Sequence, residues 1–346
     1  MVKIENIEQT LKCENNFSKY SDVKSILVRD SRVNFSPKLC VVVPTFKRPS
    51  TLKMTIDSIL NQEKFSDFLL IICDNNPERN DETEKYINTV TDPRVKYYKN
   101  AENIGLFGNW NRIFELSETE LTVIIHDDDY MFPNYLNVVY NIMSNDNAVD
   151  ALYAKPYQWN ENDEMPPNPV LYKKNHYTKL TDADLFGNPF APTGLIIKKS
   201  KMIELGGFNP DLYPASDYFF NVNAVDKINV YYTEEKLYVY RWSVNAYTKL
   251  ETLLQYPKFD IQIWKYICRK IGFPKLFTDL MMFKQKTYFL ETVKMYHPDY
   301  EIKNMQKDMN YHKNIALLFW GKIFMLFWVI YRKFTQYRNR TVIYVN

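Results

Sequence analysis

Short apolar runs alternate with segments of helical spacing over the first third of the chain. The apolar runs cover residues 39–43, 68–73, 95–98 and 121–125, and the helical patterns cover residues 50–62 and 105–116. Three of the runs are continuous and rich in β-branched residues, which is typical of parallel strands covered on both faces. Ser50 is the expected N-cap of the first helix. The alternation predicts an α/β fold with a mostly parallel central sheet flanked by helices.

The pattern divides the whole chain into three regions. Residues 1–37 are polar with weak helical periodicity and form an expected N-terminal extension. Residues 38–250 hold the α/β domain, whose second half mixes loops with strands expected at 151–153, 194–198, 230–232 and 237–240. A proline-rich segment at 165–169 predicts a mobile loop. Residues 251–346 are helical in pattern and form an expected helical C-terminal region.

The composition describes an ordinary soluble globular protein. Hydrophobic residues make up 46% of the 346 residues and charged residues 25%, and the net charge of +3 is too small to favour nucleic acid as a partner. The cysteines Cys13, Cys40, Cys73 and Cys268 form no C-x-x-C pair, which favours core thiols in a reducing compartment. The N-terminus has no apolar stretch of the secretory kind, so a cytoplasmic location is expected.

Polar residues follow three of the predicted strands, where a sheet of this type binds its ligands. The most informative are Asp127, Asp128 and Asp129, directly after the run at 121–125. Clustered carboxylates repel each other, and a divalent cation such as Mg²⁺ or Mn²⁺, which prefers oxygen ligands, would relieve that repulsion. The alternative is a solvated acidic turn, or an N-cap for a helix from Pro133 onward.

Asp217 is the second candidate, since it lies among aromatic residues at the start of a helical pattern. A carboxylate in such surroundings suits a general base with a raised pKa. The alternative is an N-cap for a helix over residues 218–225.

Six segments in this order resemble the inverting glycosyltransferases of family two, which have the GT-A fold. They are VVVPTFKRPSTL, FLLIICDNN, NIGLFGNWNRIF, LTVIIHDDDYMFPNYL, PTGLIIKKSKMIELGGFNPDLYPASDYFF and LYVYRW, within residues 38–245. The resemblance implies metal-dependent transfer of a sugar from a nucleotide-sugar donor, of the UDP type, to a hydroxyl of a glycan or lipid-linked acceptor in surface polysaccharide synthesis. The GT-A catalytic domain would then be residues 38–250.

The resemblance also implies roles for individual residues. The donor would contact Pro44, Thr45, Arg48, Asp74, Asn103, Gly105, Asn111, Asp127 and Arg241. Asp128 and Asp129 would hold the metal, and Asp217 would be the catalytic base. Two positions depart from the family pattern: Ser243 replaces a common histidine, and Ser216 replaces the acid that often precedes the base.

An apolar segment at residues 315–331 is followed by basic residues. With 17 residues it is at the short end of a bilayer span, and its tryptophans and basic flank suit insertion into the cytoplasmic leaflet. A peripheral location on the inner face of the cell membrane is therefore expected. The alternative is a helix that packs internally or against a second copy of the chain.

Two other functions compete with the transferase. A nucleotidyltransferase shares strand-end acids, but it usually has a glycine-rich loop after the first strand, and PTFKRPS has no glycine. A catalytically degenerate scaffold at the membrane is disfavoured by the complete acidic triplet and Asp217. A dinucleotide oxidoreductase is disfavoured because no G-x-G-x-x-G follows the first strand.

Overall fold

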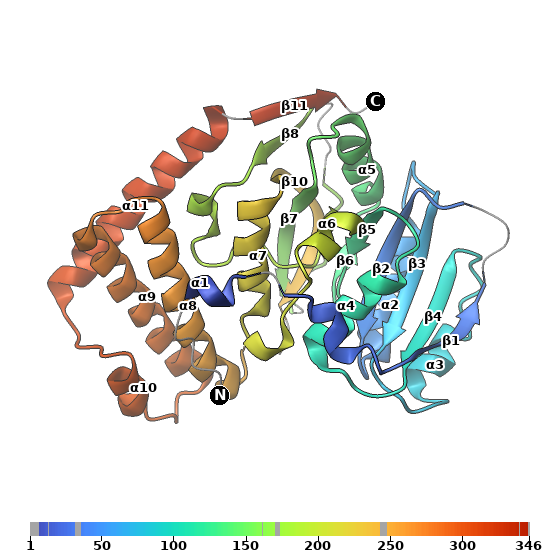
Figure 1. The fold of residues 1–346 in the computed structure, drawn as a ribbon, viewed down its shortest axis with the longest axis horizontal. Coiled ribbons are helices and arrows are strands. Elements are labelled where there is room, and N and C mark those ends of the chain that lie inside the picture. The colour runs from blue at the N-terminus through green and yellow to red at the C-terminus, as the bar shows by residue number, and fades with distance from the viewer. Residues whose placement is uncertain are drawn as a thin grey trace.

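The computed structural model describes residues 7–12, 14–31, 36–160, 162–169, 174–242, 248–338 and 340–344. One sheet runs through the molecule in the order β1-β4-β3-β2-β5-β9-β7-β10-β8-β11, and β6 pairs with β10 (Figure 1). The strands are β1 Ser25–Asp30, β2 Leu39–Thr45, β3 Phe68–Asp74, β4 Val95–Asn100, β5 Leu121–Ile124, β6 Tyr130–Met131, β7 Ala151–Asn160, β8 Lys174–Lys179, β9 Leu195–Lys198, β10 Val230–Trp242 and β11 Arg340–Tyr344.

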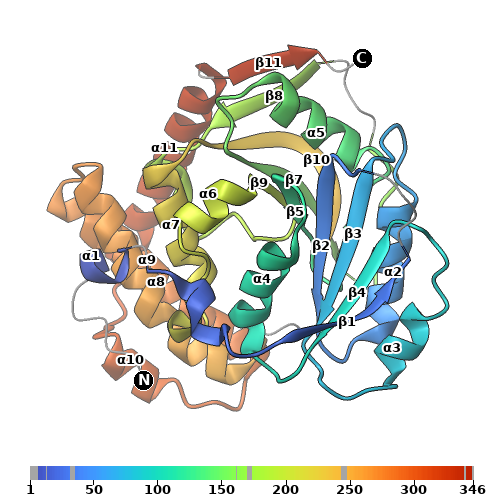
Figure 2. The same ribbon diagram turned by 45° about the vertical axis from the view of Figure 1, so that its right-hand side comes forward.

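Helices cover both faces of this sheet (Figure 2). They are α1 Ile7–Thr10, α2 Pro49–Leu60, α3 Glu82–Ile87, α4 Gly105–Leu116, α5 Tyr135–Asn145, α6 Lys199–Glu204, α7 Ser216–Lys227, α8 Leu250–Lys270, α9 Lys275–Tyr296, α10 Lys303–Asp308 and α11 Ile315–Arg338. Short 3₁₀ turns lie at η1 Asn16–Tyr20, η2 Asp182–Leu185 and η3 Pro210–Leu212.

The centre of the sheet is parallel, which confirms the predicted α/β class. β4, β3, β2 and β5 pair in parallel, as do β7 and β10. Antiparallel β9 lies between β5 and β7, and antiparallel strands complete both edges. The parallel order sends the ends of β2, β3 and β5 to one edge of the sheet, so the residues after these strands meet there.

Alternation along the strands builds two hydrophobic cores. In β2, Val41 and Val43 face α2, α3 and α5, whereas Cys40 and Val42 face the core that α4, α7, α8 and α9 complete. All four side chains are fully buried. Because successive strand residues point to opposite faces, a continuous apolar run is what a doubly covered strand requires.

Several local predictions were wrong. Pro49 begins α2 and Arg48 is its N-cap, so Ser50 is not. α5 begins at Tyr135 after Asn134, which excludes the acidic triplet as its N-cap. The two strands expected near residues 230 and 240 are one strand, β10, which continues through two register shifts.

The N-terminal segment is part of the fold rather than a separate extension. β1 pairs with β4 and forms one edge of the sheet. The side-chain amide and backbone N–H of Asn16 both donate to the carbonyl oxygen of Gly206, at 3.1 and 2.9 Å. Arg112 of α4 donates to the carbonyl oxygens of Tyr20 and Val23.

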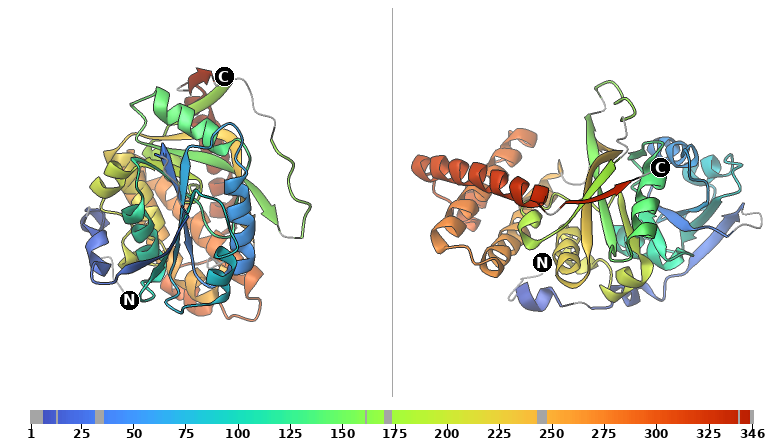
Figure 3. Two further views of the ribbon diagram at one scale, coloured as in Figure 1. Left: turned by 90° about the vertical axis from the view of Figure 1, so that its right-hand side faces the viewer. Right: turned by 90° about the horizontal axis from the view of Figure 1, so that it is seen from above.

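The C-terminal region is helical, as expected, until β11 pairs with β8 at the other edge of the sheet. α8 and α9 share the core that lies beneath α4 and α7. α11 lies on the outer side of these helices (Figure 3). Gly321 of α11 lies so close to α9 that an added Cβ would be 3.3 Å from the carbonyl oxygen of Leu280. Within the described ranges, no helix combines the length and the apolar character that a bilayer span needs.

Candidate functional site

The acidic triplet lies where β2 and β5 end. Thr45, the last residue of β2, donates from Oγ1 to Oδ2 of Asp127 at 2.7 Å. Arg48, in the turn before α2, lies 2.7 Å from Oδ2 of Asp128 and 3.4 Å from Oδ1 of Asp127. Thr45, Arg48 and two of the predicted aspartates therefore do come together. Pro44 is buried within β2, opposite Cys73 of β3.

The three aspartates differ in how far water reaches them. The exposed side-chain fractions are 8% for Asp127, 15% for Asp128 and 1% for Asp129. Burial, followed by repulsion from Asp128, raises the pKa of Asp127 to about 6. Asp128 is thus the carboxylate of the triplet that is most accessible to a ligand.

Asp129 bonds to the surrounding chain with both carboxylate oxygens. Oδ2 accepts from Thr193 Oγ1 at 2.6 Å, and Oδ1 accepts from the backbone N–H of Arg241 at 3.0 Å. Burial, and then the charge of Asp128, raises its pKa well above the usual range. These contacts tie β10 and the turn before β9 to the end of β5, which gives Asp129 a structural role whether or not it also binds a metal.

His126 is a possible metal ligand that the sequence prediction did not include. A ligand atom of His126 and one each of Asp128 and Asp129 lie within 4.8 Å of one another. Its ring stacks on Trp110 with centroids 4.7 Å apart, and its buried Nε2 has no hydrogen-bond partner. Burial lowers the pKa of His126 to about 4, so the imidazole is neutral and able to bind a cation.

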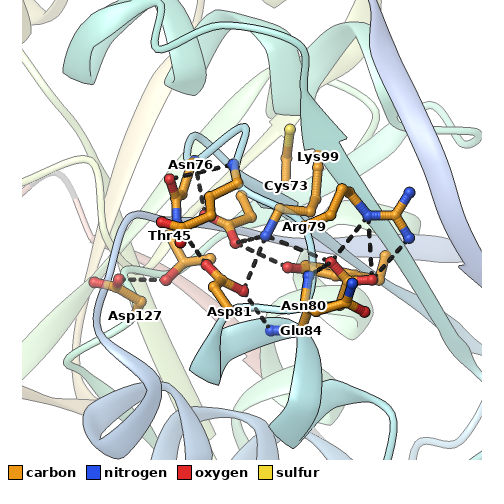
Figure 4. Close-up of polar contacts among 12 residues, drawn as sticks. Thr45, Cys73, Asn76, Arg79, Asn80, Asp81, Glu84, Lys99 and Asp127 are labelled. Carbon is orange, nitrogen blue, oxygen red and sulfur yellow. Dashed lines mark hydrogen bonds and ion pairs between the residues drawn. The ribbon is translucent and has the colours of Figure 1, made fainter.

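Asp74 ends β3, and the surrounding chain covers its carboxylate. Its side chain is fully buried, and Oδ2 accepts from Tyr97 Oη at 2.8 Å and lies 3.1 Å from Lys99 Nζ. Figure 4 shows Lys99 among the carboxylates at this end of the sheet, with Asp81 at 3.0 Å and Glu84 at 3.8 Å. The carboxylate of Asp74 is therefore covered and paired with Lys99, and its contact with the donor stays a prediction.

The donor-contact residues expected in and before α4 separate into two groups. Asn103, in the turn before α4, and Gly105, the first residue of α4, are exposed, and Asn75 donates to Asn103 Oδ1 at 2.7 Å. Asn111 is instead 2% exposed, and its amide group makes both hydrogen bonds with the backbone of Phe208, each 2.8 Å long. The side chain of Asn111 therefore joins α4 to the segment before α7.

Asp217 lies in the first turn of α7, and Ala215 is the N-cap, so the alternative N-cap role is excluded. Oδ2 accepts from Asn188 Nδ2 at 3.0 Å, and Oδ1 accepts from the backbone N–H of Tyr218 at 2.9 Å. Burial raises the pKa of Asp217 to about 6, although the side chain keeps some contact with solvent. No ion pair involves this carboxylate in the part of the chain that the structure describes.

The charges of both acidic groups, the triplet and Asp217, affect the pKa of Tyr240 in β10. Burial raises the pKa of its hydroxyl, and the charges of Asp129, Asp128 and Asp217 raise it further. The next residue, Arg241, binds Asp129 through its backbone. Its guanidinium group lies 5.3 Å from the ring centroid of Trp159 and donates to the sulfur of Met54. Ser243 lies outside the described residues.

The family model described as Glycosyl transferase family 2 matches residues 40–203. Residues 40–203, just under half of the chain, are therefore similar to the glycosyltransferase domains of family 2.

Known proteins similar to this chain agree with that assignment. A GalNAc(5)-diNAcBac-PP-undecaprenol β-1,3-glucosyltransferase of Campylobacter jejuni is 34% identical over 106 residues, which are 30% of this chain and 33% of that protein. The chain spans between a third and about half of the length of the first curated relatives it matches.

Two solved structures share this fold. Residues 1–349 of S. aureus TarS, in complex with UDP-GlcNAc, match with TM-score 0.52 and 17% identity over 79% of this chain and 78% of that one. The mannosyltransferase PcManGT from Pyrobaculum calidifontis, in complex with GDP-Man and Mn²⁺, matches with TM-score 0.52 and 12% identity, covering 91% of this chain and 90% of that one. At these identities the likeness concerns the fold alone.

Proposed function

We propose that this protein transfers a sugar from a nucleotide-sugar donor to an acceptor hydroxyl, with inversion at the anomeric carbon. The observation that carries the proposal is that one segment, between η2 and β9, contacts both acidic groups: Asn188 donates to Asp217 at 3.0 Å, and Thr193 donates to Asp129 at 2.6 Å. The triplet suits the diphosphate end of the donor, and Asp217 suits the acceptor hydroxyl. One displacement then needs no nucleophile from the protein.

Asp217 would act as the general base. A carboxylate with a pKa of about 6 is ionised at neutral pH, yet it is more basic than a solvated aspartate. It would accept the proton of the hydroxyl while that oxygen attacks the anomeric carbon. Because no cation pairs with Asp217 among the described residues, its basicity is not reduced by a salt bridge.

The nucleotide would lie at the ends of β2 and β5. Thr45, Arg48 and Asp127 contact one another there, and Asn75 links the exposed Asn103 to this end of β2, because it donates to Asn103 Oδ1 and to the carbonyl oxygen of Thr45. The TarS crystal structure contains UDP-GlcNAc, which supports a UDP-sugar as the donor to test first.

The residues of the triplet fit a divalent cation. Asp128 is the accessible carboxylate, and ligand atoms of His126, Asp128 and Asp129 lie within 4.8 Å of one another, with Nδ1 of His126 4.0 Å from Oδ2 of Asp129. Bound Mn²⁺ or Mg²⁺ would supply positive charge for the diphosphate leaving group. The structure of PcManGT with Mn²⁺ and GDP-Man supports this choice of ions.

The test is donor binding and turnover in matched variants. Thermal shift with UDP-GlcNAc and other nucleotide sugars, with and without Mn²⁺, selects the donor, since a ligand at 100 times its Kd adds about 2.7 kcal/mol. UDP release is then compared in the wild type, Asp217→Asn and Asp128→Asn. We expect both variants to lose at least about a hundredfold in rate, as general-base removal does, and only Asp128→Asn to lose Mn²⁺-dependent binding.

Two results would exclude this proposal in favour of its competitors. Pyrophosphate release from a nucleoside triphosphate and a sugar phosphate would identify a nucleotidyltransferase. If the protein binds nucleotide sugars but turns none of them over, whichever divalent metal ion is added, it is a degenerate scaffold.

We also propose that α11 contacts the inner face of the cell membrane. Its outward side exposes apolar residues, namely Ile315 (77%), Phe319 (59%), Trp320 (58%), Leu326 (60%), Phe327 (66%) and Ile330 (56%). Phe324, Met325 and Trp328 pack on the protein core from the other side of the helix.

Charge favours an anionic lipid surface as the partner of this helix. Residues 309–346 contain no Asp or Glu, and their basic residues are Lys313, Lys322, Arg332, Lys333, Arg338 and Arg340. Apolar side chains with cationic neighbours suit the boundary between headgroups and acyl chains. The undecaprenol-linked substrate in the name of the C. jejuni relative supports a lipid-linked acceptor.

Flotation with vesicles containing phosphatidylglycerol tests this contact. We expect the wild type to float, Leu326→Glu to remain in solution, and Ile203→Glu to float, because Ile203 is equally exposed (55%) but lies on α6. If Leu326→Glu floats as well as the wild type, or if light scattering shows that the mutation dissociates a dimer in the absence of vesicles, the lipid partner is wrong.

A further inference from the structure

Asn188 reaches Asp217 from a left-handed turn between η2 and β9. Gly187 and Asn188 have φ angles of +81° and +47°. Asn is one of the few residues with a side chain that adopts this region readily. The turn brings Nδ2 of Asn188 to 3.0 Å from Oδ2 of Asp217 and 3.4 Å from the hydroxyl oxygen of Tyr256.

The orientation of the Asn188 amide follows from a backbone carbonyl. The carbonyl oxygen of Phe190 can only accept, so Nδ2 of Asn221 must face it, at 2.7 Å. The same Nδ2 donates to Asn188 at 2.8 Å, which requires that Asn188 presents its oxygen there. Nδ2 of Asn188 is therefore the atom that faces Asp217. Asn221 is itself buried and accepts from the hydroxyl of Tyr153.

We propose that Asn188 is a positioning residue for the catalytic carboxylate: its amide, held by Asn221, keeps Asp217 in one orientation toward the acceptor hydroxyl. This proposal rests on the role of Asp217 given above. The two oxygens of Asp217 are then held from different segments, Oδ1 by the backbone of α7 and Oδ2 by the turn before β9. Rotation of the carboxylate would break both hydrogen bonds.

The surroundings of Asp217 make the amide of Asn188 important for its basicity. The titratable groups that face it are Tyr153 of β7, Tyr240 of β10 and Tyr256 of α8, and burial raises the pKa of each, so all three are neutral. Burial raises the pKa of Asp217, and the hydrogen bond from Asn188 is the first of the contacts that lower it. Without that donor, the pKa of Asp217 should rise further above about 6.

Asn188→Gly tests the proposal with little disturbance of the backbone. Glycine adopts the left-handed region without strain, so the turn is kept while the amide is removed. Asn310→Gly is the matched control, because Asn310 also has a φ of +47° and lies in the exposed turn after α10, between α10 and α11. Asn188→Asp is the second variant, since it keeps the size of the side chain but replaces the donor by an acceptor.

The readout is the carboxyl ¹³C resonance of labelled aspartate that is missing from Asp217→Asn, followed against pH in the full chain. A hydrogen bond to a charged group corresponds to roughly one pH unit. We expect the midpoint to rise by about that amount in Asn188→Gly, by more in Asn188→Asp, and not at all in Asn310→Gly. The acid limb of UDP release from UDP-GlcNAc should move in the same way.

A midpoint that stays at the wild-type pH in both Asn188 variants would overturn the positioning role. So would an equal shift in Asn310→Gly. Failure of the underlying function looks different: if Asp217→Asn releases UDP at the wild-type rate, Asp217 is not the base, whatever Asn188 does to its titration.

Discussion

At the scale of single residues, the ammonium group of Lys99 stabilises the ends of β3 and β4. Its side chain is 2% exposed and lies within 4 Å of the carboxylates of Asp74, Asp81 and Glu84. Carboxylates crowded in a buried site repel each other, and the cation compensates that repulsion. Removing one partner of a buried ion pair leaves uncompensated charge, which costs far more than the loss of a surface pair.

Lys99→Met should therefore lower the free energy of unfolding by roughly 3 kcal/mol or more. Lys38→Met is the control, because the Lys38–Asp67 pair is about half exposed on both sides (54% and 53%) and such pairs contribute little. Urea unfolding of both variants measures the difference. Equal losses would show that the charges around Lys99 are solvated rather than buried.

At the scale of elements, Asp260 joins α8 to α9. The carboxylate is 1% exposed and accepts from Gln285 Nε2 at 2.8 Å. Burial raises its pKa from 3.8 to about 7. Since the folded state holds this proton more tightly than the unfolded chain, Asp260 stabilises the fold at acidic pH, and that contribution is lost as the pH rises from about 4 through about 7.

Asp260→Asn should flatten this pH dependence, because an asparagine cannot ionise but can still accept from Gln285. We expect the wild type to lose more stability than the variant between pH 5 and pH 8, measured by urea unfolding. Asp279→Asn, at an exposed pair on α9, should follow the wild type. If the Asp260→Asn curve runs parallel to the wild-type curve, the carboxylate is ionised throughout this range.

The sequence predicted elements that bury themselves completely and missed those that do not. β2, β3 and β5 follow continuous apolar runs, whereas β1 is an edge strand whose side chains remain partly exposed, so it carries no comparable pattern. β10 was interpreted as two strands because polar residues follow Thr233, where the backbone continues through a register shift.

The candidate site divides in the same way. Asp128 and Asp217 were predictable from their immediate neighbours along the chain. Asp74 and Asn111 are buried against Lys99 and Phe208, which are distant in sequence, so residue type alone could not predict their burial. Asn188 could not be predicted because only the folded chain brings it to Asp217.

At the scale of the whole molecule, the N-terminal segment binds the loop after α6 through a close backbone approach. Gly206 has a φ of +78°, and a Cβ there would lie 2.0 Å from the carbonyl oxygen of Glu14. Gly272 has a φ of +74° with nothing within 4 Å of such an atom. An alanine at either position would therefore carry the same left-handed backbone strain. The two positions differ only in what surrounds the added Cβ.

Gly206→Ala should lower the free energy of unfolding by several kcal/mol, because the strain adds to a backbone collision that displaces residues 14–16. Gly272→Ala should cost only the strain of a left-handed alanine, about 1–2 kcal/mol. Urea midpoints measure both, and limited proteolysis should cut the N-terminal segment faster in Gly206→Ala alone. Equal midpoints would show that the N-terminal segment yields at no cost.

β11 fastens the end of the chain to β8, while Gly321 fits α11 against α9. A helix held at both places keeps a fixed orientation relative to the rest of the fold. A surface that contacts the outer side of α11 would therefore fix the orientation of Asp217 relative to that surface. The distance between that surface and Asp217 would then be set by the fold, and no flexible linker could change it. An acceptor anchored to the surface would have to span this distance.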